Sequence, residues 1–279
     1  MKRILLAVIA LGLTMSGFSQ EDSTKKDNVD TIKIGGMVII KRDKDGDNKD
    51  RNITISNNRK RQNKNVRTNW WVVDLGFASF NDQTTYPGAV ASGFLQPGMT
   101  EDNFDLRTGK SVNVNVWAFM QRLNLIKHVV NLKYGLGVEL NNYRFDDKRV
   151  QLVERPAAGT PYIVLNEEWD GLKKNKLAAD YLTVPVMLNF NFTPGRDKGF
   201  GFSAGVSAGY LYSSRQKIKD NDDKDKFHDN FELRKWKVSY IGELALGPVK
   251  LYGSHALKSM WEKGLDQTPY NVGVRFSGF

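Results

Sequence analysis

From Trp70 onward, apolar and polar residues alternate with a period of two in one segment after another. The clearest segment is "VNLKYGLGVELN", residues 130–141. Its even-numbered positions are all apolar, and its odd-numbered positions are all polar or glycine. Because successive side chains of a β-strand point to opposite faces, this pattern predicts a strand with one apolar face and one polar face.

Seven further segments follow the same pattern, so we expect eight strands. The expected apolar faces lie in residues 71–77, 112–120, 182–192, 200–210, 236–246 and 270–276, and the parity of the segment near 248–258 is ambiguous. In the second of the eight strands, the alternation assigns Met120 to the apolar face.

The connections between these strands alternate in length. They are long (81–109), short (124–128), long (142–176), short (193–198), long (214–233), very short (247–248) and moderate (259–268). Bacterial outer-membrane barrels have short periplasmic turns and long outer loops. The sequence therefore predicts an all-β fold, an eight-stranded antiparallel up-and-down transmembrane β-barrel over residues 69–279, with both mature termini in the periplasm and every long loop outside the cell.

Aromatic residues are expected to form girdles at the two membrane interfaces. The expected periplasmic rim comprises Trp70, Trp71, Phe190, Phe192, Phe200, Phe202, Phe276 and Phe279. The expected outer rim comprises Tyr143, Phe145, Tyr210, Tyr212, Trp236 and Tyr270. A secreted lipocalin-type barrel with its apolar face inward would show the same period, and loop lengths and aromatic positions favour the membrane.

The first 68 residues differ from the rest. Residues 1–19 have the basic start, apolar run and small-residue cleavage site of a secretory signal peptide. Residues 20–68 are predicted to be a periplasmic segment, with a hairpin at 32–40, a third short strand at 53–55 and a basic linker, "RKRQNKNVR", at 59–67. The linker is either solvated or a contact for lipid headgroups or peptidoglycan.

Composition narrows the classes of partner. The 279 residues include no cysteine and carry a formal net charge of +10. An exported chain does not normally meet nucleic acid, so anionic lipid headgroups or cell-wall polymers are the better partners for this excess charge.

Six charges are expected inside the barrel: Asp74, Lys133, Glu139, Lys237, Glu243 and Arg275. Opposite signs occur in equal numbers, which favours a paired internal network over a proton or ion path, because unpaired buried charge is costly.

Three stretches carry candidate chemistry, and each has a simpler interpretation. The segment 219–230 offers Asp220, Asp222, Asp223 and Asp225 to a divalent cation, and 43–50 faintly resembles a calcium loop, but solvated turns are favoured for both. Ser254 and His255 are adjacent on a predicted strand, so they point to opposite faces and make a poor nucleophile–base pair. We therefore expect no enzyme, and no catalytic, cofactor-binding or metal-binding residues.

The segments "GKSVNVN", "YGLGVELNNYRFDD", "LKKNKLAADYLTVPVML", "FSAGVSAGYL", "MWEKG" and "TPYNVGVRFSGF" resemble, in order and spacing, the PorT-like outer-membrane β-barrel family of Gram-negative bacteria. The resemblance implies the barrel fold and the location, and it carries over no catalytic residues. Such barrels commonly end on Phe as an assembly signal. Here Phe279 does not share the parity of Phe276, which a bulge at Gly278 would restore.

The function expected from this sequence is a non-enzymatic scaffold or binding protein, acting through outer loops that carry Trp169 and mixed charges. Its expected partners are outer-membrane lipid and lipopolysaccharide. One alternative is a subunit of a protein-secretion or envelope-assembly complex, since some PorT-like relatives are implicated in secretion. The other is a lipid-modifying enzyme.

Overall fold

The computed structural model describes residues 30–34, 37–41, 54–56, 64–194, 199–220 and 223–277. The chain divides into two compact units, Met1–Arg61 and Gln62–Phe279. The predicted signal peptide, most of the basic linker, and Gly278 with Phe279 lie outside the described residues.

The first unit contains the short strands expected in the N-terminal segment. They are β1 (Asp30–Ile34), β2 (Met37–Lys41) and β3 (Thr54–Ser56). β2 pairs antiparallel with both β1 and β3, so it is the central strand of a three-stranded sheet.

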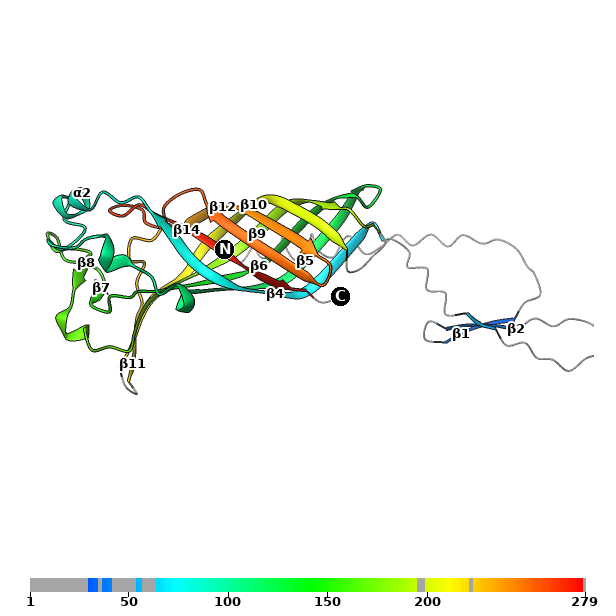
Figure 1. Cartoon of the computed structure of the whole chain (residues 1–279), viewed down its shortest axis with the longest axis horizontal. Coiled ribbons are helices and arrows are strands. Elements are labelled where there is room, and N and C mark those ends of the chain that lie inside the picture. Colours follow the sequence, from blue (N-terminus) through cyan, green and yellow to red (C-terminus); the bar gives the residue numbers. More distant parts are fainter. Residues whose placement is uncertain are drawn as a thin grey trace, which may run out of the picture. The chain divides into compact units, whose positions relative to one another are not determined.

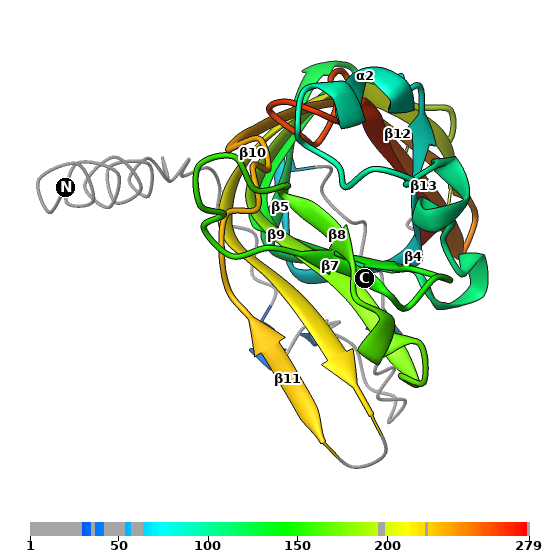
Figure 2. The same ribbon diagram turned by 90° about the vertical axis from the view of Figure 1, so that its left-hand side faces the viewer.

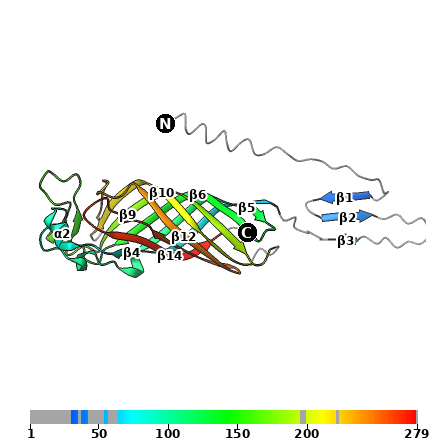
Figure 3. The ribbon, with the colours of Figure 1, turned by 90° about the horizontal axis from the view of Figure 1, so that it is seen from above.

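The second unit is a closed ring of eight antiparallel strands (Figures 1 and 3). The strands are β4 (Val66–Asp82), β5 (Val112–Ile126), β6 (Val130–Arg144), β9 (Lys174–Asn191), β10 (Phe200–Lys219), β12 (Trp236–Leu246), β13 (Val249–Ala256) and β14 (Gln267–Phe276). Neighbours in sequence are neighbours in the ring, and β14 pairs with β4 to close it. The predicted eight-stranded up-and-down topology is confirmed.

The two faces of the ring have the predicted character. The side chains at the apolar positions of the alternating pattern point outward and are exposed, as Val184, Val206 and Val272 are. The inward positions are polar and buried, as Asn113, Ser203 and Asn271 are. An apolar outer band around a polar interior is the arrangement of a transmembrane barrel and the reverse of a lipocalin. The segment of ambiguous parity, β13, has Val249 and Leu251 outward and Tyr252 inward.

One assignment in the second strand is wrong. The pairing of β5 with β6 shifts between Trp117 and Phe119, which marks a β-bulge. Beyond the bulge the alternation is inverted, so Met120 is buried inside the barrel and Phe119 packs against the exposed ring of Trp70 on the outside.

Two consecutive tryptophans face outward at the end of the ring that carries the short turns. Trp70 and Trp71 are both highly exposed, although a regular strand would send them to opposite faces. Trp71 has a φ of 53°, which breaks the alternation. A bulky residue in this region costs roughly 1–3 kcal/mol, so the strand holds both rings at this rim at the expense of local strain.

At the opposite end, the long connections fold over the ring. They contain the helix α2 (Tyr86–Ala91), the 3-10 turns η1 (Glu101–Phe104), η2 (Thr108–Lys110) and η3 (Glu167–Trp169), and the strand pair β7 (Val150–Leu152) and β8 (Ile163–Leu165). β11 (Lys224–Phe227) pairs with the far end of β10. We call residues 83–111, 145–173, 228–235 and 257–266 the cap (Figure 2).

The predicted outer girdle is only partly correct. Tyr210, Tyr212, Trp236 and Tyr270 are exposed, as expected. Tyr143 and Phe145 are almost fully buried, because even-numbered residues of β6 face outward and these odd-numbered ones point into the cap. In the part of the chain that the structure describes, no helix has the length and apolar character needed to span a membrane.

Candidate functional site

The centre of the lumen is occupied by an ion-pair network around Arg275. Its guanidinium donates to both carboxylate oxygens of Asp74, with Nε–Oδ1 at 2.7 Å and Nη2–Oδ2 at 2.8 Å, and its Nη1 pairs with Glu243. Lys133 donates to both oxygens of Glu243 at 2.6 and 2.5 Å. Asp74 and Arg275 are direct cross-strand neighbours on β4 and β14, whereas Glu243 and Lys133 approach from β12 and β6.

The other two predicted lumen charges form a second pair nearer the cap. Lys237 Nζ lies 2.9 Å from Glu139 Oε1, and Thr183 donates to the other oxygen of this carboxylate at 2.9 Å. The ammonium also lies 4.4 Å from the ring centroid of Tyr181. All six predicted lumen charges are therefore inside the barrel and paired, which supports their structural role.

Neutral polar groups fill the space between the charges. Asn113 donates to Asn115 and to Asn141, each at 2.8 Å, and Asn115 and Trp117 donate to Asp74. Tyr252 donates to Asn113 Oδ1 at 2.5 Å. The resulting interior is packed with mutually bonded side chains, as expected for a ring of eight strands.

Two glycines make room for the Tyr252 ring. Gly76 and Gly273 are direct partners across β4 and β14. A Cβ on Gly273 would lie 2.3 Å from Leu75 O and 2.7 Å from Tyr252 Cε1. Because only glycine permits this close approach, the alternation of polar and glycine positions on the inner face is a packing requirement.

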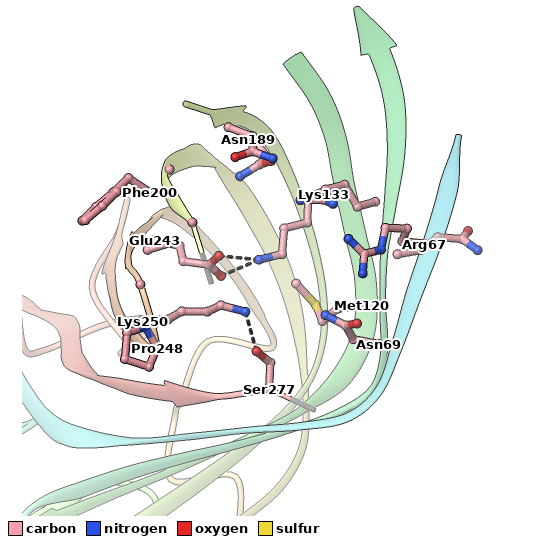
Figure 4. A pocket seen from close by; sticks show the side chains of 17 residues that line it. Arg67, Asn69, Met120, Lys133, Asn189, Phe200, Glu243, Pro248, Lys250 and Ser277 are labelled. Atoms are coloured by element: carbon pink, nitrogen blue, oxygen red, sulfur yellow. Dashed lines mark hydrogen bonds and ion pairs between the residues drawn. The ribbon is translucent and has the colours of Figure 1, made fainter. Parts of the chain in front are cut away.

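A basic cavity of about 130 Å³ opens at the short-turn end of the lumen (Figure 4). Among the described residues, four cations line it, Arg67, Arg122, Lys133 and Lys250, against one carboxylate, that of Glu243. Lys133 reaches across to Glu243, and Lys250 donates to Ser277 at 2.5 Å. The carboxylate is already shared with Arg275, so the mouth of the barrel at this end is electropositive.

The cap has a hydrophobic core that it shares with the adjoining ends of β4, β6, β9 and β10, and the sequence patterns did not predict it. Trp261, Phe94 and Phe104 are almost fully buried, and Phe94 packs edge-on against Trp261 with ring centroids 6.1 Å apart. Tyr162 stacks on the other side of Phe94 at 5.1 Å. The signal in the sequence was the number of large apolar residues within the long connections, since solvated loops have little use for them.

Buried amides bond the cap to the ring. Gln216 of β10 donates to Val150 O at 2.8 Å and accepts from Leu152 N at 2.9 Å, so it bonds to the first and last residues of β7. Gln267 of β14 accepts from Trp261 Nε1 at 2.9 Å and donates to Asp82 at 2.7 Å. These bonds join the cap to the ends of the strands.

A carboxylate at the base of β7 is held ionised by its neighbours. Asp147 accepts from Arg149 Nη2 at 2.9 Å and from Asn103 Nδ2 at 2.8 Å. Burial opposes ionisation, but the hydrogen bonds from Arg149 and Asn103 outweigh it, so the pKa of Asp147 lies below its ordinary value.

This pKa shift predicts an acid-sensitive cap. Because the pKa of Asp147 is lower in the folded protein than in the unfolded chain, its ionised carboxylate stabilises the fold at any pH above the unfolded-state pKa, about 4. This stabilisation is lost as the pH falls from about 4 through the pKa of the folded state. Hydrogen exchange of residues 145–153, corrected for the intrinsic pH dependence, should show protection that decreases over this range in the wild type. In Asp147→Asn, protection should be lower at neutral pH and nearly independent of pH. The exposed Asp170→Asn serves as the control, and an unchanged pH profile in Asp147→Asn would contradict the assignment.

Trp169 is not available for contact as predicted. It is 9% exposed and stacks on Phe227 of β11, with ring centroids 5.9 Å apart. Together with Leu172 and Ile218 it forms a small separate core. This core attaches β11 to the cap, so the function of Trp169 is to position that strand.

The remaining candidate chemistry is dispersed. Residues 43–50 and Asp222 lie outside the described residues. Asp225 is on β11 and not in a turn, and the described residues contain no cluster of three or more acidic, histidine or cysteine side chains placed to hold a metal ion. His255 points outward between Tyr240 and Tyr270, whereas Ser254 accepts from Asn271 at 3.2 Å on the inner side, as the alternation predicted.

Comparison with known proteins agrees with this geometry. A family model described as outer membrane protein beta-barrel domain matches residues 60–257. The match includes β4 through β13 and every lumen charge except Arg275. No curated protein sequence matches the chain.

Proposed function

Because the chain belongs to the outer membrane protein beta-barrel domain family, it is an integral outer-membrane protein, and we propose that it acts as a non-enzymatic scaffold or binding protein through its cap. The observation that carries this proposal is the hydrophobic core around Trp261 and Phe94, through which the cap packs onto the ends of the barrel strands. Long connections that pack onto the strand ends through a hydrophobic core keep a fixed surface, and a fixed surface binds with a smaller loss of conformational entropy than mobile loops do.

The lumen supports a scaffold more than a pore. Its six charges are paired, and neutral amides and Tyr252 occupy the space between them. The interior of an eight-stranded ring is just wide enough for side chains to fill, which favours a packed lumen over an open channel. The positions of Ser254 and His255 on opposite faces likewise favour a non-enzymatic role, and a His255→Ala variant that abolished a lipid modification would overturn it.

We further propose that the cap faces the outside of the cell and the short turns face the periplasm. The absence of native cysteine permits a direct test, because a single introduced thiol is unique. In intact cells, a membrane-impermeant maleimide should label Arg155→Cys in the cap and should label Lys127→Cys in a short turn only after lysis. The reverse pattern would overturn the orientation. A heat-dependent gel shift of each variant, taken from the outer-membrane fraction, confirms that its barrel has closed.

A second candidate is the subunit of a secretion or envelope-assembly complex suggested by the PorT-like resemblance. The observation that favours it is the N-terminal sheet, in which β1 and β3 each have one strand neighbour among the described residues. Edge strands can pair with a strand of another protein. Stoichiometric co-purification of an envelope protein that is lost on deleting residues 30–56 would support this role over the scaffold.

A further inference from the structure

A basic surface lies where the strands extend beyond the outer aromatic rim. The pairing register places Arg144 of β6, Lys176 of β9, Lys217 of β10 and Lys226 of β11 side by side in one row across the sheet. The next row consists of Lys174, Lys219 and Lys224. We call these seven side chains the basic rows. At a strand spacing of about 4.8 Å, the four-residue row spans roughly 14 Å.

A bulge in β10 brings its lysines to this face. Even-numbered residues of β10 point outward as far as Tyr212, and the pairing with β9 shifts between Leu211 and Ser213. After the shift, Lys217 pairs with Lys176 and therefore shares the outward face of β9, the face that carries Leu182 and Val184 in the membrane band. Without the bulge, Lys217 and Lys219 would point inward.

The opposite face of the same strands is apolar and attached to the cap. Ile218 is buried against Trp169 and Leu172, and Phe227 stacks on Trp169. The β10–β11 extension is therefore amphipathic, with its apolar side covered by protein. The basic side faces outward, and the packing of the apolar side against the cap holds its cations in place.

Juxtaposed like charges are stabilised by a compensating anion. Direct cross-strand pairs of like charge are destabilising, and none of the basic rows forms an ion pair with a carboxylate in the described residues. Asp180, at the base of this surface, is bonded to Arg215. Asp225 lies on the other face of β11, opposite Ile218. Arg144 donates to Lys173 O at 2.7 Å, and Lys176 donates to Asn142, both neutral acceptors.

The direction of the extension points to the source of that anion. Figures 1 and 2 show the end of β10, with β11, turning away from the ring at the cap end. When strands bend away from the barrel axis, their outward face turns toward the membrane plane. The basic rows thus overhang the surface of the leaflet in which the barrel is embedded, where lipid headgroups are present at a high effective concentration.

We propose that the basic rows bind the phosphate- or carboxylate-bearing saccharide headgroup of an outer-leaflet glycolipid. Several anionic groups on one headgroup can meet cations at strand spacing simultaneously, while the acyl chains lie against the apolar band below. The inference rests on the proposed orientation of the barrel, which is tested separately by thiol labelling.

The test uses the full chain in neutral detergent micelles with a short-chain lipopolysaccharide as the probe. The dissociation constant is compared for the wild type, Lys176→Glu/Lys217→Glu and the control Lys64→Glu/Lys127→Glu, whose lysines lie at the short-turn end. Each lysine near a membrane surface contributes to the binding free energy, so reversing the charge at two of them should raise the dissociation constant about tenfold or more. The control should bind like the wild type, and all three should show the heat-dependent gel shift.

Two further arms identify the ligand. Dephosphorylated lipopolysaccharide should bind more weakly to the wild type, and the deacylated, water-soluble saccharide should compete poorly. Equal binding by the deacylated saccharide would overturn the proposal that the ligand is a lipid and would indicate a soluble polyanion. Unchanged affinity in Lys176→Glu/Lys217→Glu would overturn the proposal that the basic rows form the binding site. If that variant fails to fold, Lys224→Glu/Lys226→Glu on the exposed edge strand replaces it, with the same expected loss.

Discussion

Replacing Arg275 by glutamine is expected to lower the free energy of unfolding of the barrel by about 3–5 kcal/mol. The guanidinium is the shared partner of Asp74 and Glu243, and all three side chains are buried. Without it, Asp74 keeps its bonds from Trp117 and Asn115 but has no compensating charge. The urea concentration at which the heat-dependent gel shift disappears should decrease accordingly. The exposed Arg155→Gln serves as the control.

A double variant separates lost pairing from lost packing. In Asp74→Asn/Arg275→Gln, Glu243 is still paired with Lys133, and the uncompensated carboxylate has been replaced by a neutral amide. Part of the stability lost in Arg275→Gln should therefore return, because most of the cost of breaking a buried pair comes from the charge left behind. A double variant less stable than Arg275→Gln would show that shape, and not charge, dominates at this position.

Replacing Trp261 by alanine is expected to unfold the cap and leave the barrel closed. The indole is 1% exposed, packs against Phe94 and donates to Gln267. Removing a buried aromatic of this size costs about 3–5 kcal/mol, and this loss falls on the core of the cap. Protease added to intact cells should cleave the variant within residues 83–111 or 145–173, while its heat-dependent gel shift persists.

The matched control is Trp236→Ala, an exposed tryptophan of the outer rim that touches Tyr210 at the barrel surface. Its cap should remain resistant to protease. If Trp261→Ala also abolished the gel shift, the cap and barrel would form one cooperative unit. The scaffold role additionally predicts that any phenotype of deleting the protein is reproduced by Trp261→Ala, since the contact surface is lost while the barrel remains.

The alternation of residue types was sufficient to predict the ring. A strand has only two faces, so the alternation of Leu182, Val184 and Val186 with Thr183 and Asn189 separates these faces without any knowledge of distant contacts. Loop lengths and aromatic positions then favoured the apolar face as the outer one. Loop lengths also predict the direction of the barrel in the membrane, which the thiol labelling tests. With the outer face assigned, the lumen charges, Arg275 among them, followed from parity.

Parity was insufficient wherever a strand is irregular. A bulge adds one residue and inverts every side chain beyond it, which is why Met120 is inside and why Lys217 is outside. Its position depends on the pairing with a neighbouring strand, between Trp117 and Phe119 or between Leu211 and Ser213, and not on the local residues. The outward basic rows are therefore a property of the folded sheet.

The cap likewise depended on contacts between distant segments. Tyr143, Phe94 and Trp261 come from three separate stretches, and no periodicity relates them, so their shared core exists only when the ring brings those stretches to one end. The sequence by itself determined the strands and their two faces, because these follow from the two-residue repeat of a single strand, and its loop lengths and aromatic positions indicated that the polar face is the lumen. Only the tertiary structure decided the cap, the burial of Trp169 and the direction of the basic rows, because each requires strands that are far apart in sequence to lie in register.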